Sequence, residues 1–111
     1  MNAIRNSVRL IGHVGANPDV KEFDGGNKMA RLSLATNDNY TDKKGEKQTT
    51  TEWHNIVAWG KSAELVEQLL KKGTEVAVEG KLTTRSYEKD GDKKYITEVV
   101  INELLVLTKK S

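Results

Sequence analysis

The stretch Thr51–Gly60 reads TEWHNIVAWG and contains both tryptophans of the chain, Trp53 and Trp59. Its β-branched and aromatic residues favour a strand, in which alternate side chains point to opposite faces. The two indole rings then share one face with a polar asparagine, whereas Ile56 and Ala58 point the other way, as core residues do. Flat rings beside a polar side chain are unusual in a core layer but suit a surface that stacks on flat ligands. Either ring taken alone would more often be buried, so the choice depends on the rest of the chain.

Lysines flank this expected strand on both sides: Lys43, Lys44 and Lys47 precede it, and Lys61 follows it. Single-stranded nucleic acid offers a π-face on every base and a negative charge on every phosphate, so it requires aromatic platforms in a basic setting. The net charge of +2 is only mildly basic and does not by itself indicate a polyanionic partner. The stretch therefore favours a nucleic-acid-binding strand without establishing it.

The composition fits one folded domain. The chain has 111 residues, of which 31% are charged and 36% hydrophobic, and this is enough to bury a core. It has no cysteine, which excludes disulfides, thiolate zinc sites and cysteine nucleophiles. No apolar run is long enough to cross a bilayer, and the N-terminus lacks the apolar core of a signal peptide. We therefore expect a cytoplasmic protein without a membrane partner.

Turn residues divide the chain into strands and one helix. The charge-rich segment Asp38–Gln48 is expected to be a polar loop, and Asp90-Gly91 a hairpin turn. Ser62–Lys72 has the apolar period of a short amphipathic helix, with Ser62 as its N-cap and Gly73 as its stop. The expected strands are Ser7–Val14, Val20–Phe23, Lys28–Asn37, Thr49–Trp59, Thr74–Tyr87 and Tyr95–Leu107.

A strand-rich chain with one helix between its third and fourth long strands fits the OB-fold, a five-stranded Greek-key barrel. Gly12 and Gly80 lie inside expected strands, where a glycine commonly marks a sharp bend at a barrel corner. We therefore expect a single mainly β domain over residues 1–111, with the barrel over about residues 7–107.

Five segments, in this order and spacing, carry a likeness to a known family: SVRLIGHVGANPDV, LATNDNY, TEWHNIVAWGKSAE, LLKKGTEVAVEGKLTTRSY and YITEVV. With them the chain resembles the bacterial single-stranded DNA-binding proteins, the SSB family, from about Ser7 to Leu107. The resemblance implies an OB-fold that usually assembles as a homotetramer. It also implies that single-stranded DNA is wrapped without sequence preference during replication, recombination and repair.

The resemblance also implies roles for individual residues. Leu69 stands where the family can have tyrosine, and Asn55 where it often has a basic residue, so we expect no base contact at the first and no phosphate contact at the second. His54 is expected to be packed or to lie at a subunit interface. The stacking aromatics would be Tyr40, Trp53, Trp59 and Tyr87. The phosphate contacts would be Lys44, Lys61, Lys72 and Arg85, followed by Lys81 and Arg5.

The C-terminus departs from the family. Its members typically continue into a flexible linker and an acidic tip that recruits replication and repair enzymes, whereas this sequence ends at Lys109-Lys110-Ser111. A naturally short paralogue and a shortened chain both remain open. We therefore assign no partner-recruiting function to the residues present.

Three other functions compete with single-stranded DNA binding: catalysis, protein contacts and RNA binding. No nucleophile–base constellation, phosphate loop or metal-ligand spacing is discernible, and His13 lies far from His54, so we expect no enzyme, no metal and no cofactor. An OB-fold module that acts mainly through protein contacts, like a primosomal replication factor, would be a dimer rather than a tetramer. RNA binding also stays open, because stacking on a base ignores the 2′-hydroxyl.

Overall fold

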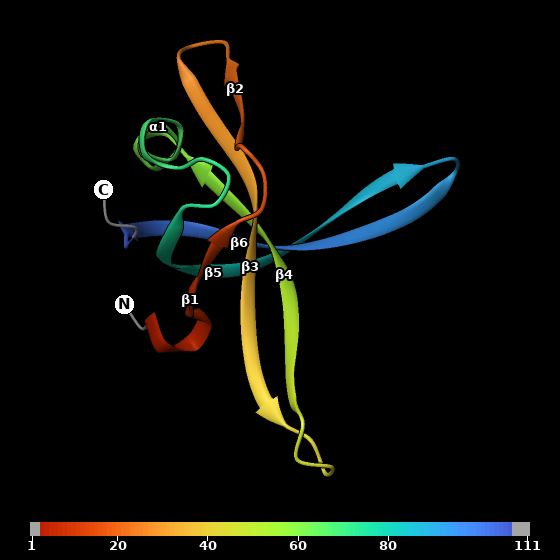
Figure 1. Ribbon diagram of the computed structural model, residues 1–111. Helices are drawn as coiled ribbons and strands as arrows, with labels where there is room; N and C mark the ends of the chain where they lie inside the picture. Colours follow the sequence, from red (N-terminus) through yellow and green to blue (C-terminus); the bar gives the residue numbers. More distant parts are fainter. Residues whose placement is uncertain (1–2, 108–111) are drawn as a thin grey trace.

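The computed structural model describes residues 3–107 of the chain, which form six strands, one α-helix and a short 3-10 turn (Figure 1). In chain order, the elements are the 3-10 turn Ala3–Asn6, β1 Val8–Val14, β2 Asp19–Phe23, β3 Asn27–Thr41, β4 Lys47–Trp59, α1 Lys61–Leu69, β5 Glu75–Lys89 and β6 Asp92–Val106.

The strands pair in the order β1-β5-β6-β4-β3-β2, and β1 also pairs with β3 at His13 and Val14. This second pairing closes β1, β5, β6, β4 and β3 into a barrel. All of the pairs are antiparallel except β4 with β6, which is parallel at Ile56 and Val57. The predicted five-stranded barrel with one helix is confirmed. β2 is an additional strand that lies outside the barrel and pairs with β3.

The core fills the inside of the barrel and its α1 end. Inward-facing side chains of the strands meet the buried face of α1, which packs against β3, β4 and β6. An ion pair between Lys28 Nζ and Glu67 Oε1, 2.7 Å long, also links β3 to the helix. The largest fully buried side chains are Leu34, Ile56, Val66 and Val76.

Two interior glycines allow strands to approach closely, as their position in the sequence predicts. A Cβ atom on Gly12 would overlap the carbonyl oxygen of Ala35 in β3. A Cβ atom on Gly80 would overlap the carbonyl oxygen of Val100 and lie 2.7 Å from Cα of Ile101 in β6. The register of β5 with β6 shifts at Gly80, so this glycine marks a bulge at a barrel corner.

The helix is shorter than predicted and is capped differently. It begins at Lys61 after Gly60, and no side chain caps its first turn, so the assignment of Ser62 as N-cap is wrong. It ends at Leu69 because Leu70 turns to an extended backbone, and the Leu70 side chain is buried in the core. Gly73, with φ 92°, lies beyond the helix in a turn and donates its N–H to the carbonyl of Val14 at 2.8 Å.

The expectation of a polar loop over Asp38–Gln48 is wrong for most of that segment. β3 and β4 stay paired out to Thr41 and Lys47, well beyond the barrel. Polar side chains rather than an apolar face join the two strands there, and polar pairs leave no hydrophobic alternation in the sequence. The cross-strand hydrogen bonds run from Thr49 Oγ1 to Asn39 Oδ1 at 2.8 Å and from Thr51 Oγ1 to Asn37 Oδ1 at 2.7 Å.

Asp42 organises the turn that closes this hairpin. Its carboxylate accepts hydrogen bonds from the backbone N–H groups of Lys44 and Glu46, both at 2.9 Å, and from the side-chain amide of Gln48 at 3.2 Å. The hydrogen bond from the Glu46 backbone, more than the others, lowers the pKa of Asp42 and keeps the carboxylate charged.

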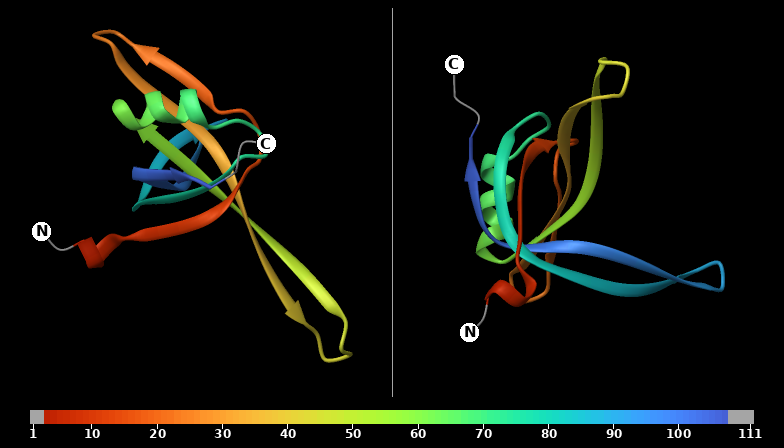
Figure 2. Two further views of the ribbon diagram at one scale, coloured as in Figure 1. Left: turned by 60° about the vertical axis from the view of Figure 1, so that its left-hand side comes forward. Right: turned by 90° about the horizontal axis from the view of Figure 1, so that it is seen from below.

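The β5–β6 hairpin forms a second long arm. Both strands run past the predicted ends to a turn at Asp90-Gly91, where both residues have positive φ, as in a type I′ turn. The β3–β4 and β5–β6 arms leave the barrel in different directions (Figure 2). They raise the radius of gyration to 16.1 Å, above the about 13 Å of a compact domain of this length.

Candidate nucleic-acid interface

The strands β3 and β4 turn one side toward the core and present the other side, here called the outer face, away from it. Opposite residues of an antiparallel pair point to the same side, so the register shows which side chains share this face. The outer-face pairs are Met29 with Trp59, Arg31 with Val57, Ser33 with Asn55, and Ala35 with Trp53.

One outer-face residue is less accessible than the sequence suggests. The alternation of β4 puts Val57 on the same face as the two tryptophans, but only 3% of its surface is exposed. Its neighbours across the strands are Arg31 on β3 and Val100 on β6. The exposed platforms are therefore separated by a covered patch rather than by open apolar surface.

Trp53 is an accessible ring that packs against the protein backbone. Its side chain is 61% exposed, and its ring lies against the backbone of Gly15 in the turn after β1. A Cβ atom on Gly15 would overlap Cζ3 of the ring, so only glycine leaves room for the indole in this position. The ring therefore lies against the protein at Cζ3 and Cη2 while much of its surface stays accessible.

Replacing Gly15 with alanine is expected to displace the Trp53 ring and weaken any ligand that stacks on it, by up to about 1–3 kcal/mol. Gly15 does not have positive φ, so the effect should come from the ring and not from backbone strain. Binding of oligo-dT and the tryptophan emission spectrum measure the change, with Ala16→Ser at the exposed next residue as the control. Wild-type affinity and emission in Gly15→Ala would contradict the role of this contact.

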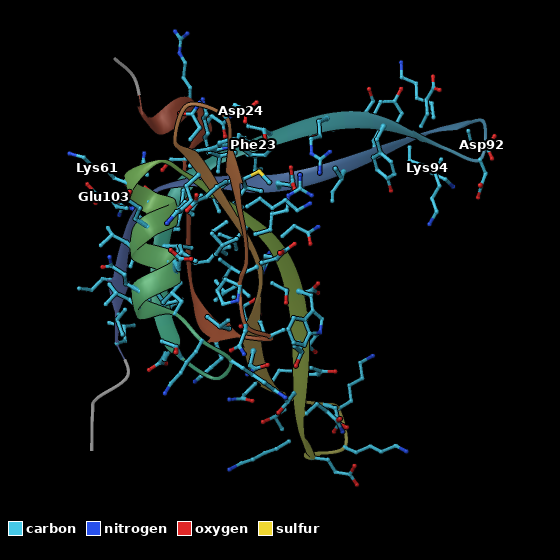
Figure 3. All side chains as sticks on the ribbon, turned by 90° about the horizontal axis from the view of Figure 1, so that it is seen from above. Phe23, Asp24, Lys61, Asp92, Lys94 and Glu103 are labelled. Atoms are coloured by element: carbon cyan, nitrogen blue, oxygen red, sulfur yellow. The ribbon has the colours of Figure 1, made fainter. Side chains whose placement is uncertain are left out.

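Trp59 is paired with a second aromatic ring. Phe23 lies at the end of β2 (Figure 3). Its ring stacks on that of Trp59, with ring centroids 6.1 Å apart and an interplanar angle of 25°. Trp59 is 50% exposed and Phe23 is also exposed. Sequence reasoning missed Phe23; the available signal was that the only phenylalanine precedes the Asp24–Asn27 turn, beside a long strand. Phe23 therefore supports the Trp59 ring from one face, and half of the Trp59 surface stays exposed.

Tyr40 and Tyr87 are exposed, but they lie apart from the tryptophans. Tyr40 belongs to the β3–β4 arm, opposite Gln48, and Tyr87 to the β5–β6 arm, opposite Lys94. The structure therefore puts Trp53 and Trp59 six residues apart on one face of β4 and each tyrosine on a separate arm. The two arms can be followed in Figure 1.

The six predicted phosphate-binding cations are all exposed, but they do not form one patch. Lys61 is the first residue of α1, on the side of the barrel away from the tip of the β5–β6 arm, where Lys94 lies (Figure 3). Lys72 follows the helix, and its backbone N–H donates to Asn17 Oδ1 at 2.9 Å. The others are Arg5 in the 3-10 turn, Lys44 in the β3–β4 turn, and Lys81 and Arg85 on β5.

Arg85 is held by a carboxylate. Its Nε donates to Oε1 of Glu98 across the β5–β6 pair at 2.9 Å, and the Glu98 side chain is buried. This hydrogen bond raises the pKa of Arg85, so the guanidinium stays charged. The ion pair occupies Nε and leaves the side chain partly exposed, with the remaining guanidinium nitrogens as potential donors.

His54 is half-buried, and its Nε2 lies 2.9 Å from the hydroxyl of Thr36. Its place at a subunit interface stays a prediction. In residues 3–107, no group of three or more histidine, cysteine, aspartate or glutamate side chains could hold a metal ion. The same part of the chain has no helix long and apolar enough to span a membrane.

Comparison with known proteins gives consistent matches. The sequence model of the Single-strand binding protein family matches residues 5–107. The chain is 47% identical over 107 residues to single-stranded DNA-binding protein 1 of Chlorobaculum tepidum and 42% identical to that of Xylella fastidiosa, covering 95% of this chain in each case. It spans 66% of the length of the first relative and 79% of the second.

Two solved structures resemble the fold closely. A Plasmodium falciparum SSB in complex with ssDNA superposes with a TM-score of 0.83 at 38% identity, covering 93% of this chain and 95% of that one. A deletion mutant of the single-stranded DNA binding protein from Thermus aquaticus gives a TM-score of 0.79 at 37% identity, covering 93% of this chain and 50% of that one.

Proposed function

Because the chain belongs to the single-strand binding protein family, we propose that it binds single-stranded DNA without sequence preference and protects it during replication, recombination and repair. The observation that carries the proposal is the pair of half-exposed tryptophans on the outer face. Stacking on an aromatic ring is worth about 1–3 kcal/mol per base and tolerates any base, because every base has a π-face.

Stacking on these platforms selects single strands over duplex. The bases of a duplex are already stacked on each other and shielded, whereas an open strand can lay its bases on Trp53 and Trp59. The proposed phosphate contacts nearest the arms are Lys44, Lys81 and Arg85. Each phosphate contact on a single strand steepens the fall of log K with log salt by about 0.7. For a DNA strand that continues around the barrel, we propose further phosphate contacts at Lys61, Lys72 and Arg5.

Fluorescence anisotropy of a labelled oligo-dT tests the function. We expect saturable binding that weakens as salt rises, and little competition from a duplex of the same length. A matched oligo-U distinguishes DNA from RNA, and tighter binding to oligo-U would replace the proposed ligand with RNA. Equal binding of duplex and single strand would contradict the stacking mechanism.

We further propose that copies of the chain assemble into a homotetramer. β1 is an edge strand: Val8–Gly12 pair with β5 alone, so their other edge can pair with a second copy. On the same sheet, Ile11, Ala77 and Leu105 lie in one row across β1, β5 and β6, with Ile11 61% and Leu105 64% exposed. An apolar row beside an open edge is suited to self-association. Assembly would multiply the DNA-binding surface along one strand.

Substituting Ile11→Glu together with Leu105→Glu is expected to break the tetramer, because buried carboxylates without partners oppose association. Sedimentation velocity at micromolar concentration measures the change in mass, and Leu65→Glu on the exposed side of α1 is the control. A wild-type protein that sediments as a monomer, or a double variant that stays a tetramer, would contradict this interface.

A further inference from the structure

Arg31 lies on the outer face between the two tryptophans. Its register partner on β4 is Val57, two residues from Trp59 and four from Trp53. Since a strand advances about 3.3 Å per residue, Arg31 is about 7 Å along the sheet from one platform and about 13 Å from the other. A single strand that lays bases on both rings must pass over this position.

The Arg31 side chain has an unsatisfied donor. Its Nε is buried and has no hydrogen-bond partner in the described residues, whereas buried polar groups are nearly always paired. Among the same residues, Arg31 forms no ion pair, although Asp19 is its register partner on β2. Arginine is a cation, so a positive charge with an unpaired, buried N–H lies beside this part of the surface.

A groove lies beside Arg31. It has a volume of about 260 Å³, and Ser33, Asn55 and Asn17 line it together with Arg31. Two carboxylates also line it: Glu98 is paired with Arg85 at 2.9 Å, and Asp19 is exposed. Glu98 is already paired with Arg85, and among the described residues no ion pair joins Asp19 to Arg31, so a ligand that binds the Arg31 charge competes with the Asp19 carboxylate.

We propose that Arg31 holds a phosphodiester group of the strand that runs between Trp53 and Trp59, a contact that neither the sequence nor the family likeness assigns. A planar guanidinium matches phosphate oxygens with two parallel N–H donors, which suits a groove between two stacking platforms. This inference rests on the proposed function, since it takes the strand to follow the outer face.

The salt dependence of oligo-dT binding tests the contact. In Arg31→Met, which keeps the aliphatic stem and loses the charge, the slope of log K against log salt should decrease by about 0.7. The affinity should accordingly fall about fivefold at 0.1 M salt and approach the wild-type value near 1 M. Lys71→Met removes the same charge from the exposed turn after α1 and should leave the slope unchanged. Adding Asn55→Arg, in the same groove, to Arg31→Met should restore the slope.

The possible results separate this inference from the proposed function. If the wild-type protein does not bind oligo-dT, the proposed function is wrong, and the Arg31 phosphate contact is wrong as well. If the wild type binds and Arg31→Met has an unchanged salt slope, the phosphate contact is overturned, whether or not the affinity falls. Circular dichroism melts check that each variant is folded. If Arg31→Met is not folded, Arg31→Gln, which keeps a donor near the buried position, is compared with the wild type in the same way.

Discussion

Replacing both Trp53 and Trp59 with alanine is expected to weaken oligo-dT binding by about 2–6 kcal/mol if the two losses add, which corresponds to at least about a thirtyfold rise in Kd. Both side chains are at least half exposed, so their loss removes stacking surface without opening the barrel core. The free energy of unfolding should change much less, chiefly through the Trp59–Phe23 ring pair, which is worth about 0.5–1.5 kcal/mol.

The matched control replaces both tryptophans with phenylalanine, which keeps a flat ring at each position. Anisotropy titrations with labelled oligo-dT measure affinity, and thermal melts measure stability. The stacking assignment is wrong if the alanine variant binds as tightly as the wild type. It is equally wrong if that variant loses its cooperative melting transition, because the rings would then be structural.

Gly80→Ala is expected to destabilise the fold by about 3 kcal/mol or more, since the added methyl group would meet the β6 backbone rather than a movable side chain. The strands β5 and β6 would have to separate at the bulge that turns the barrel corner. For a domain of this size, the loss corresponds to a fall in Tm of at least about 10–20 °C.

Thermal denaturation followed by circular dichroism measures this effect, and Lys81→Ala, at the exposed next residue of β5, is the control with an expected change within about 0.5 kcal/mol. A Gly80→Ala protein that melts at the wild-type temperature would mean that the two strands do not approach as closely as described.

The barrel was predictable because its elements carry local signals. The inward alternation of Ala30, Leu32 and Leu34 marks β3, and glycines in strands mark the close approaches. The β3–β4 arm was not predictable in the same way. Thr49 and Thr51 hold it together through polar cross-strand pairs, which look like solvated loop residues in a sequence.

The site was only partly predictable, because exposure depends on tertiary neighbours. Alternation identified the Trp53 and Trp59 face, but it could not show that Val57 on the same face is covered. The Phe23–Trp59 pair joins residues 36 positions apart, and the unpaired Nε of Arg31 is visible only when its surroundings are known. Conversely, a basic residue is easily found in a sequence, yet Lys61 lies on the side of the barrel away from the tip of the β5–β6 arm, and Arg85 is engaged by Glu98.

Intrinsic tryptophan fluorescence, titrated with oligo-dT at low and high salt, tests the central claim most directly, because both tryptophans of the chain lie on the outer face. Stacking of bases on Trp53 and Trp59 predicts strong quenching that saturates, with an affinity that falls as salt rises. Unchanged emission at saturating oligo-dT, while anisotropy reports binding, would put the DNA elsewhere on the protein and contradict the account.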